Sequence, residues 1–185
     1  ASGQDTLCGR RFDRQDGELP RGYDHKYVYS HFGYNLKATD LQAAIGVAQL
    51  KKLPSFVERR RHNFARLRAA LVDMEDFFVL PEATEHAAPS WFGFLLTCRE
   101  GVEREPIVRA LEAHGIQTRM LFAGNLVKHP CFDLLRKEGR GYRVVGELSA
   151  TDRIMNDTFW LGVYPGMTEV QIDYMAEVLQ SALKG

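Results

Sequence analysis

The sequence predicts an α+β domain of a few strands covered by helices, preceded by an irregular arm and two long linking helices. After residue 76, segments of aromatic and β-prone residues alternate with amphipathic helical segments, which is typical of this class. Residues 38–75 have helical spacing of apolar residues, whereas residues 1–37 have no helical or strand period. We therefore expect an arm (1–37), linking helices (38–75) and a small α+β domain (76–185).

The arm is rich in Gly, Asp and Arg and carries an aromatic run from Tyr23 to Tyr34. A segment of this length without regular structure is unusual inside a compact domain. We expect the arm to pack on a part of the protein that lies outside this sequence.

The linking helices have recognisable start signals. Thr39 or Asp40 can cap a helix that runs to Leu50, and Pro54 is expected to kink it or to start a second helix over 55–74. The basic run 59–61 on that second helix indicates a solvated face, with a phosphate site as the alternative.

The elements of the small domain follow from local patterns. Strands are expected at 77–80, 91–98, 116–120 and 158–163 because these segments are rich in aromatic and β-branched residues. Helices are expected at 104–114, 149–156 and 168–183, with Gly115 ending the first and Thr168 capping the last. Residues 121–143 carry turn signals and are predicted to form a loop.

Composition excludes several classes of protein. The 185 residues are 45% hydrophobic and 26% charged, which is ordinary for a globular protein. Lys and Arg balance Asp and Glu at 24 each, so no net charge attracts nucleic acid or an anionic membrane. No apolar run is long enough to span a bilayer, and the first twenty residues do not resemble a signal peptide. We expect a cytoplasmic protein with reduced thiols.

Two loops combine side chains capable of chemistry, although common catalytic motifs are absent from the sequence. In the first, Asn35 and Lys37 precede a helix start, where free N–H groups could help to hold a phosphate; the alternative is an ordinary helix entry with Asn35 closing a turn. In the second, Arg119 could clamp an anionic substrate near His129, or could be a structural arginine at a strand end.

Two long motifs resemble one family. SHFGYNLKATDLQAAIGVAQLKKL (30–53) and GIQTRMLFAGNLVKHPCF (115–132) are similar, in this order, to motifs of the DegT/DnrJ/EryC1/StrS sugar aminotransferase family. The resemblance implies the C-terminal small domain of a fold-type I, B6-dependent enzyme, with the catalytic residue upstream and none in this chain. It also implies that Asn35 and Lys37 reach the cofactor phosphate of a neighbouring subunit in a homodimer with shared active sites. Arg119 and His129 would approach the sugar nucleotide.

Segments 23–37, 89–97, 119–126 and 151–166 further resemble the CDP-4-keto-6-deoxy-D-glucose-3-dehydrase subgroup. This similarity implies removal of the C3 hydroxyl of a CDP-linked 4-keto-6-deoxy sugar on the way to 3,6-dideoxyhexoses of lipopolysaccharide O-antigen. The implied cofactor is pyridoxamine 5′-phosphate, or pyridoxal phosphate (PLP), with a histidine in place of the usual lysine.

The same subgroup implies a 2Fe–2S cluster held by four cysteines and a partner reductase that supplies electrons. Cys8 is the expected final ligand, with the other cysteines upstream of Ala1; the alternative is an incidental free thiol. Cys98 and Cys131 are predicted to be packing residues.

Two rival interpretations remain. An ordinary nucleotide-sugar aminotransferase would share the fold but would use a lysine and have no need of Cys8. A stand-alone interaction module would use the aromatic arm as a partner surface and would be soluble and monodisperse alone. The dehydrase interpretation instead predicts a fragment that is inactive alone and exposes apolar patches.

Overall fold

The computed structural model describes residues 15, 17–21, 23–24, 28–29, 32–34 and 36–183. The chain divides into two compact units, Ala1–Ala48 and Gln49–Gly185, and each is described by itself.

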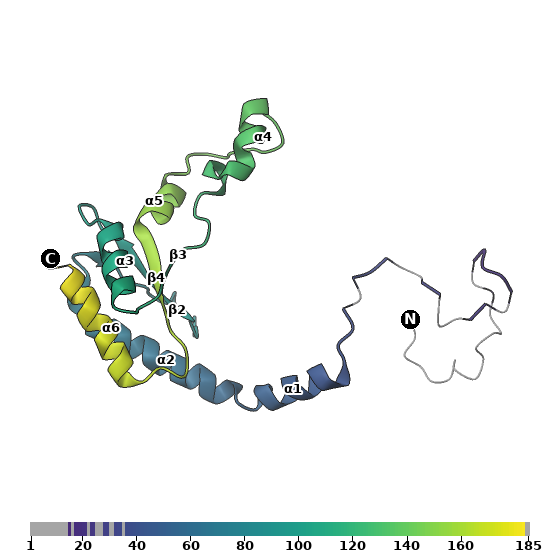
Figure 1. The fold of residues 1–185 in the computed structure, drawn as a ribbon, viewed down its shortest axis with the longest axis horizontal. Coiled ribbons are helices and arrows are strands. Elements are labelled where there is room, and N and C mark those ends of the chain that lie inside the picture. Colours follow the sequence, from purple (N-terminus) through teal and green to yellow (C-terminus); the bar gives the residue numbers. More distant parts are fainter. Residues whose placement is uncertain are drawn as a thin grey trace. The chain divides into compact units, whose positions relative to one another are not determined.

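Helix α1 (Asp40–Leu50) follows a segment without regular secondary structure and begins at the predicted cap (Figure 1). The Gln42 amide donates to Thr39 Oγ1 at 3.3 Å, and the Thr39 amide donates to Gln42 Oε1 at 2.9 Å, which closes a capping box. No residue of α1 is buried, and Leu41 is 73% exposed. The apolar stripe that predicts this helix therefore has no cover within the described residues.

Helix α2 (Leu53–Ala70) has Pro54 in its first turn, where the missing amide costs no helical hydrogen bond. A short 3₁₀ helix, η3 (Val72–Met74), follows it. Leu67 and Leu71 are fully buried, as the helical spacing of apolar residues predicts, whereas Phe56 in the first turns of α2 is 37% exposed.

The sheet has four antiparallel strands in the order β1-β2-β4-β3. Its strands are β1 (Phe78–Val79), β2 (Gly93–Cys98), β3 (Thr118–Met120) and β4 (Thr158–Gly162). Strands form where the sequence predicts them, and all four are shorter than the predicted segments. In the central pair, Leu95 lies opposite Trp160, and on the other side of β4 Arg119 lies opposite the same residue.

The core lies on one face of this sheet, under α2, α3 (Arg104–Ala113) and α6 (Glu169–Ala182) (Figure 1). Alternate residues of β2 and β4 point into it, because successive strand side chains face opposite ways. Among the fully buried side chains are Phe94, Leu96, Phe159, Leu161 and Leu179. Cys98 is also in this core, which confirms its predicted packing role.

The segment after β3 contains more regular structure than predicted. It forms two 3₁₀ turns, η4 (Leu126–Lys128) and η5 (Pro130–Phe132), and then α4 (Asp133–Glu138), which ends at Gly139 with φ 64°. Helix α5 (Ser149–Asp157) confirms the next predicted helix. The prediction of a plain loop over 121–143 is wrong, because short local hydrogen-bonded turns leave no long hydrophobic period. Cys131 is exposed, so its predicted packing role is also wrong.

The basic run on α2 contacts the segment before β2. Arg60 donates to the Ser90 hydroxyl at 3.2 Å, and Arg61 donates to the Pro89 carbonyl at 3.1 Å. These contacts tie α2 to the segment before β2, while Arg59 and Arg61 are exposed, as the prediction of a solvated face requires. None of the helices in the described ranges combines the length and the apolar character needed to cross a bilayer.

Candidate functional site

The candidate site lies on the outer face of the sheet, the face away from the core. Leu95, Trp160 and Arg119 form a row across β2, β4 and β3, because residues directly opposite in antiparallel strands share a face. Their strand neighbours Leu96, Phe159 and Leu161 point the other way into the core.

Arg119 is exposed and uses one guanidinium nitrogen to donate to the Thr118 carbonyl at 2.9 Å. Within the described part of the chain it forms no ion pair, which leaves most of its five N–H donors for a ligand. Its charge reaches Glu112, whose pKa is lowered first by the Thr118 backbone amide and hydroxyl and to a smaller extent by Arg119. Arg119 can therefore accept an anionic group.

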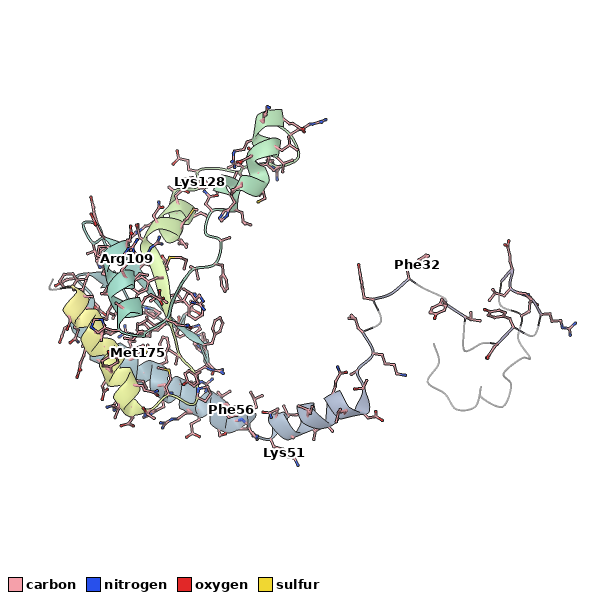
Figure 2. All side chains as sticks on the ribbon, viewed as in Figure 1. Phe32, Lys51, Phe56, Arg109, Lys128 and Met175 are labelled. Carbon is pink, nitrogen blue, oxygen red and sulfur yellow. The ribbon has the colours of Figure 1, made fainter. Side chains whose placement is uncertain are left out.

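The loop after β3 is fixed to α5 by a polar cluster. The buried Asn125 donates to Asp152 Oδ1 at 2.7 Å, while its own Oδ1 accepts from the Val127 amide at 3.2 Å. Lys128, labelled in Figure 2, pairs with Asp152 at 2.8 Å. The hydrogen bonds from Lys128 and then Asn125 lower the pKa of the Asp152 carboxyl. This cluster orders the segment that carries His129.

His129 is half-buried and takes part in the same loop. Its Nε2 lies 2.7 Å from the Ala123 carbonyl oxygen, and since a carbonyl only accepts, Nε2 carries the proton. In the neutral ring Nδ1 is then an acceptor. Arg119 lies in β3, and His129 directly follows η4 in the loop after that strand. In the described part of the chain, no hydrogen bond joins their side chains.

A hollow of about 490 Å³ adjoins this loop, but its charges are already paired. Lys128 binds Asp152, and Arg136 binds Asp133. Lys128 and Arg136 therefore stabilise the loop through these ion pairs. Arg119, which has no such partner among the described residues, is the better candidate to bind an anion.

Three aromatic residues, two on the outer face and one in the turn after β3, lie in segments that resemble the subgroup but carry no predicted role. Trp160 donates from Nε1 to the Met120 carbonyl at 3.1 Å, and Phe92 meets its indole edge-on at a centroid distance of 5.4 Å. Phe122, with φ 50°, is 76% exposed. One signal was available: a glycine inside a strand, here Gly93, often marks a close approach of another group.

The other predicted site residues lie in or near the arm. Asn35 and Cys8 are outside the described residues, so their predicted roles stay predictions. Lys37 is exposed in a segment without regular secondary structure just before α1. The closed capping box and Asp40 in the first turn reduce what the start of α1 offers a phosphate, so an anion here would depend on side chains.

The described residues contain no cluster of three or more His, Cys, Asp or Glu side chains that could hold a metal ion. Burial raises the pKa of the Cys98 thiol to about 11, which keeps it protonated and unsuited to binding iron. Cys131 is exposed as a free thiol. Cys98 is therefore a poor ligand for an iron–sulfur cluster, and the predicted ligand role of Cys8 stays a prediction.

A comparison with protein families matches residues 14–180 to the DegT/DnrJ/EryC1/StrS aminotransferase family. The chain is 54% identical over 177 residues to the lipopolysaccharide biosynthesis protein RfbH of Salmonella typhimurium, covering 95% of this chain and 39% of that protein. It is 48% identical to the dTDP-4-dehydro-2,6-dideoxy-D-glucose 3-dehydratase of Saccharopolyspora spinosa, covering 95% of this chain and 37% of that protein.

Solved structures agree with this match. The Escherichia coli GDP-4-keto-6-deoxy-D-mannose-3-dehydratase with bound hydrated PLP superimposes with a TM-score of 0.71 and is 28% identical in sequence. The match covers 83% of this chain and 38% of that structure. The chain thus spans about two fifths of the relatives it matches, and its fold is part of that of PLP-dependent, aminotransferase-like enzymes.

Proposed function

Because this chain belongs to the DegT/DnrJ/EryC1/StrS aminotransferase family, we propose that it is the C-terminal part of a nucleotide-sugar 3-dehydratase. The observation that carries the proposal is the 48% identity over nearly the whole chain to a protein named as a sugar 3-dehydratase. The proposed substrate is a CDP-linked 4-keto-6-deoxy sugar, and the similarity to RfbH favours a role in lipopolysaccharide biosynthesis.

The proposed contribution of this chain is to bind and orient the substrate. Arg119 has free donors for the anionic part of the nucleotide sugar. His129 offers Nδ1 as an acceptor, and the Asn125–Asp152 hydrogen bond holds the loop that carries it. The catalytic residue lies upstream in this proposal.

The proposed cofactor is pyridoxamine 5′-phosphate or PLP. When bound, the pyridoxamine form would supply an amine, and the ring of either form would accept electrons. The exposed Lys37, with Asn35 beside it in the sequence, would bind the cofactor phosphate of a neighbouring subunit in a homodimer. Cys8 is proposed as one ligand of a 2Fe–2S cluster that receives electrons from a reductase. The free thiols Cys98 and Cys131 favour the reducing cytoplasm.

The experiment uses the intact protein with its upstream part, the cofactor, a reductase and the CDP-linked 4-keto-6-deoxy sugar. With two electrons and two protons, the C3 hydroxyl leaves as water and C3 gains a hydrogen, so mass spectrometry should find a product lighter by one oxygen atom. An amine in place of the C4 ketone, formed with an amino donor, would instead identify an aminotransferase. No conversion of any nucleotide sugar would refute both enzymes and favour an interaction module.

Arg119 gives a matched test of the substrate-binding role. Arg119→Gln should raise KM for the nucleotide sugar more than it lowers kcat, because it removes binding outside the reacting centre. Arg109→Gln is the control, since Arg109 (Figure 2) is an exposed arginine on α3 that pairs with Glu105 at 2.7 Å. If the two variants had equal KM and kcat values, Arg119 would not be a substrate-binding residue.

A further inference from the structure

Trp160 is held in one orientation at the centre of the outer face. Its Nε1 donates to the Met120 carbonyl at 3.1 Å, and the Phe92 ring meets it at an interplanar angle of 87°. A Cβ added at Gly93 would lie 2.7 Å from Cε3 of the indole, so the ring rests against the Gly93 backbone. Three contacts therefore fix the indole before any ligand arrives.

This aromatic pair is not part of the core. Trp160 is only half-buried, and Phe92 is 60% exposed, on the sheet face opposite Phe159 and Leu161. A fixed, accessible indole presents a π-face, on which any nucleobase can stack. Its rigidity also lowers the entropy cost of binding.

The surface beside Trp160 is open. Gly93 and Gly162 lie opposite each other in β2 and β4, two residues along from Leu95 and Trp160, and so share the outer face with them. A Cβ added at Gly162 would meet no atom within 4 Å among the described residues. The floor next to the indole therefore has room for a flat ring.

Charge complements this arrangement. Arg119 lies directly opposite Trp160 and is exposed, with most of its donors unused in the described part of the chain. A π-face next to a guanidinium suits a molecule that joins a flat base to an anionic phosphate group.

We propose that Trp160 stacks on the nucleobase of the nucleotide sugar over the Gly162 floor, while Arg119 binds the diphosphate. This inference rests on the proposed function and deepens it, because it names the part of the substrate that this chain recognises. Since stacking tolerates every base, discrimination between bases would come from residues outside this platform.

The test uses the intact protein labelled with fluorotryptophan, in which the Trp160 fluorine resonance is identified by its loss in Trp160→Phe. CDP should shift this resonance, whereas ribose 5-phosphate, which carries a phosphate but no base, should not. Trp160→Ala should weaken CDP binding by about 5- to 150-fold, while Trp160→Phe keeps most of the affinity.

Gly162→Val provides a second variant that does not depend on removing the indole. It should fill the open floor and weaken CDP binding, with unchanged thermal stability. Arg119→Gln should weaken CDP and ribose 5-phosphate alike, and Arg109→Gln should change neither.

Unchanged CDP affinity in both Trp160→Ala and Gly162→Val would overturn the inference. So would a Trp160 resonance that does not move at saturating CDP in a protein that converts the nucleotide sugar, and in that case the proposed function stands. A resonance that responds to CDP in a protein that converts no nucleotide sugar would support the platform and refute the proposed function.

Discussion

The Asn125 side chain donates a hydrogen bond of 2.7 Å to the Asp152 carboxylate and so joins the loop after β3 to α5. Asn125 is buried, with 3% of its surface exposed, and Lys128 binds the same carboxylate. Because His129 follows within the same turn, this contact determines where the predicted substrate-binding side chain lies.

Asp152→Asn should loosen the loop without unfolding the domain. The neutral amide loses the ion pair to Lys128 and weakens the bond from Asn125, since bonds to charged groups are the stronger ones. Hydrogen exchange at pH 7 should become faster for the amides of residues 123–129 and stay unchanged in β2. Glu147→Gln, which removes an exposed charge upstream of α5, is the control, and equal exchange in the two variants would contradict this role of Asp152.

The stability difference between wild type and Asp152→Asn should depend on pH. The folded state lowers the pKa of Asp152 below its ordinary value of 3.8, so its contribution to stability is complete above that value. The contribution is lost as pH falls through the lower pKa of the folded state. Thermal melts should therefore separate wild type from Asp152→Asn at neutral pH and converge in strong acid. A difference that grows toward acid would have the wrong sign.

The two described cysteines should differ in reactivity. Cys98 is buried and the pKa of its thiol is raised to about 11, whereas Cys131 is exposed. Because the thiolate is the reactive form, iodoacetamide at pH 8 should label Cys131 quickly and Cys98 only after unfolding. Peptide mass spectrometry in a Cys8→Ser background measures both sites. Rapid labelling of Cys98 in the folded chain would contradict its place in the core.

The elements that the sequence predicts well are those with a strong local signal. Helix α6 combines an apolar period with the Thr168–Gln171 capping box, and α2 has Pro54 in its first turn. Helix α4 was missed because it has only six residues, too few to show a period. The strand order and the pairing of Arg119 with Trp160 depend on contacts between distant segments, which no local pattern records.

The candidate site was predicted only in part for the same reason. Arg119 and His129 stand in a family motif that implies their role. Trp160 and Phe92 also lie in segments that resemble the subgroup, but they look like ordinary strand residues until the sheet brings them together. Asn63 is polar within an apolar helical stripe, and only the fold reveals that it is buried and bonded to the Tyr164 carbonyl.

Asn63→Asp should be strongly destabilising. The Asn63 amide donates to the Tyr164 carbonyl at 2.9 Å and to the Met167 carbonyl at 3.5 Å, and its Oδ1 is buried without a hydrogen-bond partner in the described structure. A carboxylate cannot donate and would face those carbonyls, at a cost of about 3 kcal/mol or more. Chemical denaturation measures the loss.

The pH dependence of this variant separates charge from shape. Burial raises the pKa of the introduced carboxyl, so the variant should lose stability relative to wild type as pH rises above about 4. Asn63→Ala, the control, should cost about 1–3 kcal/mol with no such dependence. A deficit for Asn63→Asp that is equal at all pH values would show that the carboxyl escapes to solvent.

Gly124→Ala should displace the loop from α5. Gly124 has φ 58°, and an added Cβ would lie 2.7 Å from Met155 Cβ and 2.9 Å from the Met155 Cα. The second of these atoms belongs to the backbone and cannot rotate away, so the loop itself must move. Gly146→Ala is the matched control, because its φ is 69° but an added Cβ would meet nothing within 4 Å in the described structure.

The two variants share the cost of a left-handed alanine, about 1 kcal/mol, and differ in the contact with α5. Chemical denaturation should therefore give Gly124→Ala an extra loss of about 1–3 kcal/mol, which is typical of overpacking. Hydrogen exchange should also quicken at the Val127 amide, because the Asn125–Asp152 bond depends on the same close approach. An equal loss of unfolding free energy in the two variants would mean that α5 moves away from the added methyl group at no cost. The close packing of the loop against α5 would then not fix the position of Asn125.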